Sequence, residues 1–148
     1  MDRPTVLIAD DHPSVLERLA TLLKDRFDVV GTVTDGAQLV DAALQLRPAI
    51  VITDISMPGL TGIEAIQQLR RGGLDAKFVV LTMHADADLA DEAMRAGASA
   101  YVVKVSAGRE LMTAIDEAVA GRSYVTPMLK RQDSRTVAPA SPSDRAER

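Results

Sequence analysis

Five polar side chains stand at or just after the ends of short apolar runs, where they could meet in one cleft. They are Asp10, Asp11, Asp54, Thr82 and Lys104. Carboxylates within a few ångströms of one another repel, and a divalent ion that prefers oxygen ligands removes that conflict. Mg²⁺ typically uses one or two carboxylates together with waters and a phosphate. These residue types therefore predict a Mg²⁺ site with a lysine beside it.

A carboxylate flanked by a metal ion and a lysine is suited to phosphoryl transfer, because both cations stabilise the charge that develops. The acceptor would be a carboxylate that becomes an aspartyl phosphate. Asp54 is the best candidate, since the adjacent pair Asp10 and Asp11 is better placed to bind the metal. Thr82 could donate a hydrogen bond to a phosphoryl oxygen, and Lys104 supplies the second cation.

Five β-branched runs should form the sheet that positions these residues. They are Val6–Ala9, Val29–Val33, Ile50–Thr53, Val79–Leu81 and Val102–Val103. Their starts lie 23, 21, 29 and 23 residues apart, a spacing typical of strand–helix units in a parallel sheet and too long for hairpins. Their nearly continuous apolar character is expected of strands covered on both faces.

Helical periodicity in the intervening segments predicts five helices, the last ending near Gly121. We expect an α/β fold with a doubly wound, five-stranded parallel sheet in the flavodoxin-like order 2-1-3-4-5. Ligands in this class bind at the carboxyl ends of the strands. The fourth helix, around Leu89–Ala96, has a sparse apolar face, with only Leu89 and Met94 beside alanines. Its packing should therefore be marginal.

Charge and composition change near the end of the chain. Residues 122–148 contain six Lys/Arg and three Asp/Glu, whereas residues 1–121 contain eleven and eighteen. No periodic apolar pattern follows Leu129. We expect a folded domain over residues 1–125 and a flexible linker or tail over residues 126–148.

The motifs around these residues resemble the receiver domains of two-component response regulators, over about residues 4–125. The resemblance rests on Asp10-Asp11-His12-Pro13, Asp54 with Met57-Pro58-Gly59 and Gly62, Leu81-Thr82-Met83-His84, Gly97-Ala98 and Tyr101-Val102-Val103-Lys104. It implies a signalling domain, not an enzyme, although such domains assist their own phosphorylation and dephosphorylation. The resemblance implies that a histidine kinase phosphorylates Asp54.

The resemblance also implies roles for single residues. Mg²⁺ would be held by Asp10, Asp11, Asp54 and the backbone carbonyl of Ser56. Thr82 and Tyr101 would report phosphorylation to the face formed by the fourth helix, fifth strand and fifth helix. In this scheme the Thr82 hydroxyl moves toward the phosphoryl group, and the Tyr101 ring turns inward from an exposed position.

Other motifs resemble the receiver class that carries a C-terminal four-helix helix-turn-helix domain, among them Gly121-Arg122-Ser123-Tyr124-Val125-Thr126-Pro127. The sequence ends about where such an effector domain would begin. We expect a fragment of a longer transcription regulator that binds DNA only through that absent domain and forms a homodimer on phosphorylation. A stand-alone receiver, or an interaction module that does not depend on phosphorylation, is the alternative.

Composition and motifs exclude several other classes. The absence of cysteine excludes disulfides, thiolate metal sites and a cysteine nucleophile. No apolar run is long enough to span a membrane, no signal peptide is visible, and a cytoplasmic protein is expected. The net charge of −4 disfavours non-specific binding of nucleic acid. No glycine follows the first strand to cradle a dinucleotide, and Ser56 stands where aspartate-nucleophile phosphatases carry a second Asp.

Ordinary structural roles compete with some of these assignments. Asp10 and Asp11 could simply cap the first helix, and Tyr101 could be a packed strand aromatic. His12 and His84 are the only histidines. They are expected to be solvated loop residues, with His84 placed to influence hydrolysis of the phosphoryl group. Val105 stands where many receivers have a proline, and the sequence leaves the isomer of the Lys104–Val105 bond open.

Overall fold

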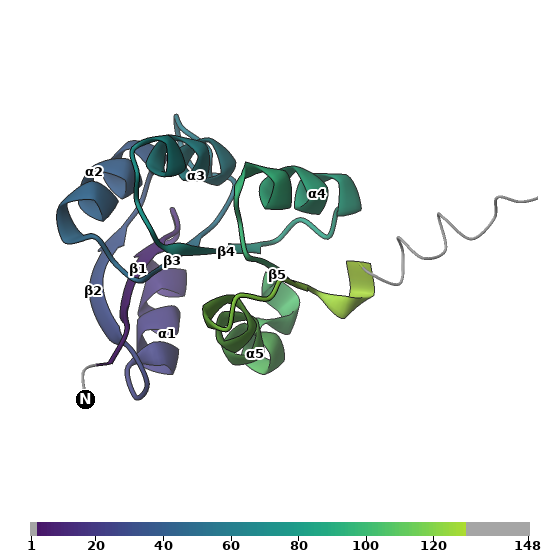
Figure 1. Ribbon diagram of the computed structural model, residues 1–148. Helices are drawn as coiled ribbons and strands as arrows, with labels where there is room; N and C mark the ends of the chain where they lie inside the picture. Colours follow the sequence, from purple (N-terminus) through teal and green to yellow (C-terminus); the bar gives the residue numbers. More distant parts are fainter. Residues whose placement is uncertain (1–2, 130–148) are drawn as a thin grey trace, which may run out of the picture.

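The computed structural model describes residues 3–129, which form one parallel sheet with helices on both faces (Figure 1). The strands are β1 (Thr5–Ala9), β2 (Asp28–Val33), β3 (Ile50–Thr53), β4 (Lys77–Thr82), β5 (Ala100–Val103) and β6 (Tyr124–Val125). The helices are α1 (Pro13–Leu23), α2 (Gly36–Leu46), α3 (Gly62–Arg71), α4 (Ala87–Ala96) and α5 (Ala107–Val119), with a single 3₁₀ turn, η1, at Lys104–Ser106.

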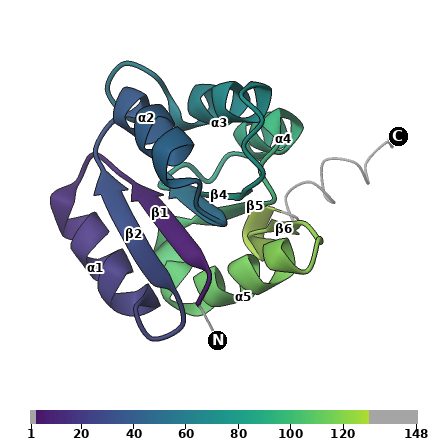
Figure 2. The same ribbon diagram turned by 60° about the vertical axis from the view of Figure 1, so that its left-hand side comes forward.

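The strand order is β2-β1-β3-β4-β5-β6, with every pair parallel. The predicted fold class and the order 2-1-3-4-5 are therefore confirmed. One short strand is added at the β5 edge, where Ala100 pairs with Tyr124 and Tyr101 with Val125. Figure 2 shows β6 beside β5, at the opposite edge of the sheet from β2.

The sheet separates two apolar layers. On one face, side chains of α2, α3 and α4 pack against alternate strand residues such as Leu7, Val51 and Val80. On the other face, α1 and α5 pack against the intervening residues, among them Ile8 and Ile52. Because both faces are covered, the inner strands consist almost entirely of apolar residues.

Short local signals place the helix starts. Pro13 occupies the first position of α1, where its fixed φ suits a helix and its missing N–H costs nothing. Asp86 caps α4 by accepting hydrogen bonds from two backbone amides. At the start of α3 the hydroxyl of Thr61 accepts from the amide of Glu64, while the Glu64 carboxylate accepts from the amide of Thr61. These caps satisfy amides that the first helical turn leaves without partners.

Helix α4 has the sparse apolar face expected from the sequence, since only Ala90 and Ala93 on it are fully buried. The packed part of the chain continues past residue 125, because Thr126 and Leu129 have no exposed surface. The boundary expected at residue 125 therefore lies at least four residues too early. The remainder of the expected tail, residues 130–148, lies outside the described residues.

Within residues 3–129, no helix is both long and apolar enough to cross a membrane.

Candidate functional site

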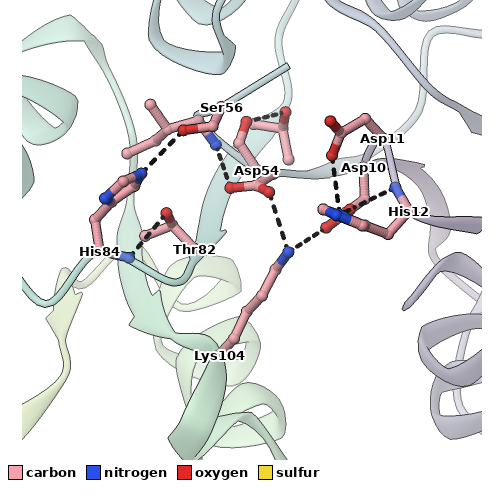
Figure 3. Close-up of polar contacts among 10 residues, drawn as sticks. Asp10, Asp11, His12, Asp54, Ser56, Thr82, His84 and Lys104 are labelled. Carbon is pink, nitrogen blue, oxygen red and sulfur yellow. Dashed lines mark hydrogen bonds and ion pairs between the residues drawn. The ribbon is translucent and has the colours of Figure 1, made fainter. Parts of the chain in front are cut away.

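The polar residues singled out from the sequence meet at the carboxyl ends of the central strands (Figure 3). The strand register brings them together, because Ala9 pairs with Thr53 and Thr82 pairs with Val103. Asp10 and Asp54 each come one residue after those paired ends, and Lys104 follows β5 directly. The order β1-β3-β4-β5 thus gathers them at one edge.

Asp54 is fixed by backbone and side-chain hydrogen bonds and is only 4% exposed. Its amide donates to the carbonyl of Ala9 at 3.0 Å. Its Oδ1 accepts from the amide of Ile55 at 2.7 Å, and its Oδ2 accepts from the Lys104 Nζ at 3.0 Å. Both carboxylate oxygens are therefore oriented by donors, so the Asp54 side chain has a defined position in the site.

Lys104 links two buried carboxylates. Its Nζ lies 2.6 Å from Asp10 Oδ2 and 3.0 Å from Asp54 Oδ2. Burial of the ammonium group acts to lower the pKa of Lys104, but the hydrogen bonds to Asp10 and Asp54 outweigh it. The net effect raises the pKa of Lys104 above the ordinary lysine value, so the ammonium stays charged at neutral pH.

In the adjacent pair Asp10 and Asp11, one carboxylate oxygen has no hydrogen-bond partner. The Nδ1 of His12 lies 3.1 Å from Asp10 Oδ1 and 3.0 Å from Asp11 Oδ1. Only the Asp10 contact has hydrogen-bond geometry, and the buried Asp11 Oδ1 has no hydrogen-bond partner. An unpartnered buried carboxylate oxygen beside a second carboxylate fits a hard cation such as Mg²⁺.

The acidic pair is not a helix cap. The N-cap of α1 is His12, and no side chain caps that helix. Asp10 instead accepts from the amide of His12 through Oδ1, while its Oδ2 faces Lys104. Capping, the competing explanation from the sequence, therefore does not account for Asp10 and Asp11.

Gly62 fixes the loop that carries Asp54. Its amide donates to the carbonyl of Ile55 at 2.9 Å. A Cβ at position 62 would lie 1.9 Å from the carbonyl oxygen of Asp54, closer than any side chain could fit. The capping box of Thr61 and Glu64 then starts α3 at this point. The loop after Asp54 thus depends on the absence of a side chain at Gly62.

His84 connects the loop after Asp54 to the neighbouring strands. Its Nε2 lies 2.9 Å from Ser56 Oγ, and its amide donates to Thr82 Oγ1 at 3.2 Å. Its carbonyl accepts from the hydroxyl of Tyr101 at 2.7 Å. The Thr82 hydroxyl therefore lies beside the site but is bonded to His84, not to Asp54.

The exposed position expected for Tyr101 is wrong in this structure. The residue has no exposed surface, and its ring packs in the same apolar layer as Ala90 and Ala93. These alanines leave room for the ring beneath α4, and the His84 carbonyl satisfies its hydroxyl. Burial, together with the negative charges of Asp86 and Asp54, raises the pKa of Tyr101 far above its ordinary value.

The two histidines do not form a metal pair. His12 is solvated, with 65% of its side chain exposed, yet it contacts the acidic pair, and its ring nitrogen groups with Asp10 and Asp11 as a candidate ligand. His84 contacts Ser56. The signal for the His12 contact was its position two residues after Asp10, a spacing at which Asp often bonds the following backbone. The Lys104–Val105 peptide bond is trans, as are all peptide bonds in the described chain.

Comparison with known proteins gives a consistent result. The family profile of the response regulator receiver domain matches residues 6–116. The chain is 34% identical over 129 residues to the response regulator GacA of Pseudomonas aeruginosa, covering 86% of this chain and 60% of that protein. It is 33% identical to the response regulator UvrY of Escherichia coli K12, with 86% and 59% covered. The chain thus spans about 60% of the length of these relatives.

Solved structures agree with the sequence relatives. A two-component response regulator of the LuxR family from Aurantimonas superposes with a TM-score of 0.85 at 32% identity, covering 91% of this chain and 99% of that one. The isolated receiver domain of RcsB from Salmonella enterica, with the phosphomimetic BeF₃⁻, gives a TM-score of 0.80 at 28% identity, covering 88% and 98%.

Proposed function

The chain belongs to the response regulator receiver domain family, and from this premise we propose that it is the phosphoacceptor of a two-component system, with Asp54 as the modified residue. The single observation that carries the proposal is the setting of Asp54. Its buried carboxylate is oriented by an amide and an ammonium group, close to the acidic pair Asp10 and Asp11, in which Asp11 Oδ1 has no hydrogen-bond partner. In a signalling domain, these residues would promote the phosphorylation of Asp54 and would not turn over a metabolite.

The proposed reaction is a phosphoryl transfer from a phosphohistidine of the cognate kinase. A carboxylate oxygen of Asp54 forms a bond to phosphorus as the phosphorus–nitrogen bond breaks, and the histidine ring leaves with the electron pair and takes up a proton. Lys104 Nζ, already 3.0 Å from Asp54 Oδ2, can pair with the negative phosphoryl oxygens. The hydroxyl of Thr82, one hydrogen bond away at His84, is a second donor for those oxygens.

The residues present also support Mg²⁺ as the cofactor. Asp10, Asp11, Asp54 and the backbone carbonyl of Ser56 would hold it, and the unpartnered Oδ1 of Asp11 is the strongest support in this chain. When bound, Mg²⁺ neutralises charge on the phosphoryl oxygens. Lys104 alone faces two carboxylates, so a further cation is needed before another anion can enter.

The conformational response to phosphorylation would depend on residues next to the site. Addition of a phosphoryl group brings almost two negative charges and strong acceptors, which draw the Thr82 hydroxyl away from His84. We propose that α4, β5 and α5 respond, because α4 packs through two alanines and is the least costly element to move. Tyr101 would act as the second switch residue through its bond to His84.

For the whole protein we propose transcription regulation in the cytoplasm. Among the similar structures, RcsB is described as dimers bound to DNA, and GacA and UvrY are named response regulators. By analogy, this receiver would form a homodimer on phosphorylation and act on DNA through a C-terminal domain outside this sequence. The kinase would be its upstream partner.

Phosphorylation is tested by intact mass after incubation with acetyl phosphate and Mg²⁺. The parent protein should gain one phosphoryl group, and Asp54→Asn should gain none. Asp41→Asn, an exposed carboxylate on α2, is the matched control and should label like the parent. Asp11→Ala should label poorly and recover in part at raised Mg²⁺, whereas Thr82→Ala should still label.

Equal labelling of Asp54→Asn and the parent would refute the assignment of the acceptor. A parent protein that never labels, but still binds a kinase, would instead favour the interaction module that does not depend on phosphorylation.

A further inference from the structure

The segment Tyr124–Leu129, here called the C-terminal strap, covers the edge of the sheet at β5. Its first two residues form β6, and the amides of Tyr124 and Thr126 donate to the carbonyls of Ser99 and Tyr101 at 3.0 and 2.9 Å. In Figure 1 the strap is the yellow-green segment that runs along β5 below α4. The last described residues of the chain therefore lie beside β5, the strand that leads to Lys104.

Thr126 makes the tightest side-chain connection in the strap. It is fully buried, and its Oγ1 accepts from the amide of Val103 at 3.0 Å. The same hydroxyl donates to the carbonyl of Tyr101 at 3.4 Å. The side chain thus continues the strand pairing for one more step, where the backbone of the strap has already turned away.

The strap contacts both layers of the protein. Tyr124 packs on the α5 side, and its hydroxyl donates to Glu110 at 3.1 Å. Leu129 has no exposed surface and lies in the opposite apolar layer, together with Tyr101 and the alanines of α4. The strap therefore crosses the edge of the sheet, and its far end shares a packing cluster with the buried Tyr101 ring.

The two positions that bind the strap are also connected to the phosphorylation site. Tyr101 reaches Thr82 through His84. Val103 directly precedes Lys104, whose ammonium contacts Asp54. The strap and the site around Asp54 therefore both contact the same part of β5, residues 101–103, or the residue that follows it.

We propose that docking of the C-terminal strap is coupled to phosphorylation of Asp54, so that each strengthens the other. The coupling rests on the function proposed above. New negative charge at Asp54 attracts Lys104 and Thr82. This favours the buried position of the switch residue Tyr101 and restrains Val103, the two residues of β5 that the strap contacts. A docked Leu129 in turn supports the buried Tyr101 ring. Thr126 and Leu129 are positioning residues in this scheme, since neither contacts Asp54.

The first measurement is amide hydrogen exchange on the full chain, with and without beryllofluoride and Mg²⁺ as the phosphoryl mimic. Exchange of the strap amides and of the Val103 amide should slow about five-fold or more, the usual lower range of coupling between two sites. Unchanged or faster exchange in the strap, with beryllofluoride bound, would overturn the proposal.

The reciprocal measurement is the affinity for beryllofluoride, followed by calorimetry in the presence of Mg²⁺. Thr126→Val removes the hydroxyl at constant shape and should weaken binding about five-fold, whereas Thr126→Ser should bind like the parent. Leu129→Ala should weaken binding as Thr126→Val does. Leu23→Ala is the matched control, because Leu23 is equally buried but lies in the other apolar layer, and it should leave the affinity unchanged.

Two outcomes separate this inference from the proposed function. If the parent binds beryllofluoride and labels at Asp54, but Thr126→Val and Leu129→Ala bind as well as the parent does, only the strap coupling is wrong. If the parent neither labels nor binds the mimic, the phosphoacceptor function itself fails. Should Leu129→Ala not fold, Thr126→Val with its Thr126→Ser control decides the question alone.

Discussion

Replacement of Lys104 by methionine tests the charge balance of the site. Methionine keeps most of the length of the side chain but removes the ammonium group. Asp10 is 1% exposed and Asp54 4%, so Lys104→Met leaves two nearly buried carboxylates without their cation. The variant should unfold more easily than the parent when Mg²⁺ is absent.

The expected loss can be estimated from the two contacts. At separations of 2.6 and 3.0 Å, each ion pair has a gross Coulomb attraction of about 6 kcal/mol at an effective dielectric constant of about 20. Desolvation of the ammonium group offsets much of that attraction. Loss of one partner from a buried ion pair usually costs about 3–5 kcal/mol, and we expect a value in the lower half of that range because 13% of the lysine side chain is exposed.

The assay is urea unfolding at neutral pH with and without Mg²⁺, because urea, unlike guanidinium, does not screen charge. Lys24→Met, at an exposed position after α1, is the control and should change stability by less than about 0.5 kcal/mol. Mg²⁺ should recover much of the loss in Lys104→Met, since the ion compensates the same carboxylates. A loss below about 1 kcal/mol, or one that Mg²⁺ leaves unchanged, would refute this account.

The pH dependence gives a second check on Lys104. Its pKa is raised in the folded protein, so its stabilising contribution is fully present below the unfolded value of about 10.4. The contribution is lost as the pH rises from there through the folded pKa. The parent should therefore lose stability more steeply than Lys104→Met above about pH 10.4. Parallel curves for the two proteins would contradict the raised pKa.

Three other changes have defined outcomes. Thr61→Ala removes the side-chain cap of α3 and should lower the free energy of unfolding by about 1 kcal/mol, while Thr61→Ser should not; urea unfolding measures both. Gly62→Ala places a methyl group against the carbonyl of Asp54, so acetyl phosphate should label the variant more slowly than the parent. An equal rate would show that the loop accommodates the methyl group without moving Asp54. Burial and the hydrogen bond to Glu110 raise the pKa of Tyr124 to about 12, and the only other tyrosine, Tyr101, is raised further. Tyr124→Phe should therefore remove the first step of the absorbance titration at 295 nm. A first step near pH 10 in the parent would contradict the shift of Tyr124, and a step near pH 10 in the variant would contradict that of Tyr101.

The central sheet and its site were predictable because both depend on strong, repeated patterns. Apolar β-branched runs at intervals of 21–29 residues leave little choice but parallel strands joined by helices. Residues that directly follow such strands, such as Asp10, Asp54 and Lys104, then meet without any further information. The sparse apolar face of α4 was also predictable from the sequence, because Ala90 and Ala93 offer little apolar surface whatever they pack against.

The misplaced features depend on what fills space next to them. Whether Tyr101 lies inside or outside depends on the room left by the alanines of α4 and on an acceptor at His84, and neither follows from a strand pattern. β6 has only two residues, too few for a periodic signal. The buried position of Thr126 likewise depends on the open edge of β5, which a linear sequence does not reveal.

Closure of the sheet by β6 also affects how the chain avoids aggregation. Parallel strands pair across long stretches of chain and form slowly, and until they close, an open strand edge can pair with another molecule. Once Tyr124 and Val125 are paired and Thr126 covers the Val103 amide, that edge offers only a two-residue strand. An edge so short is a poor template for a foreign strand. The same few residues that lead out of the domain thus protect it from intermolecular β-pairing.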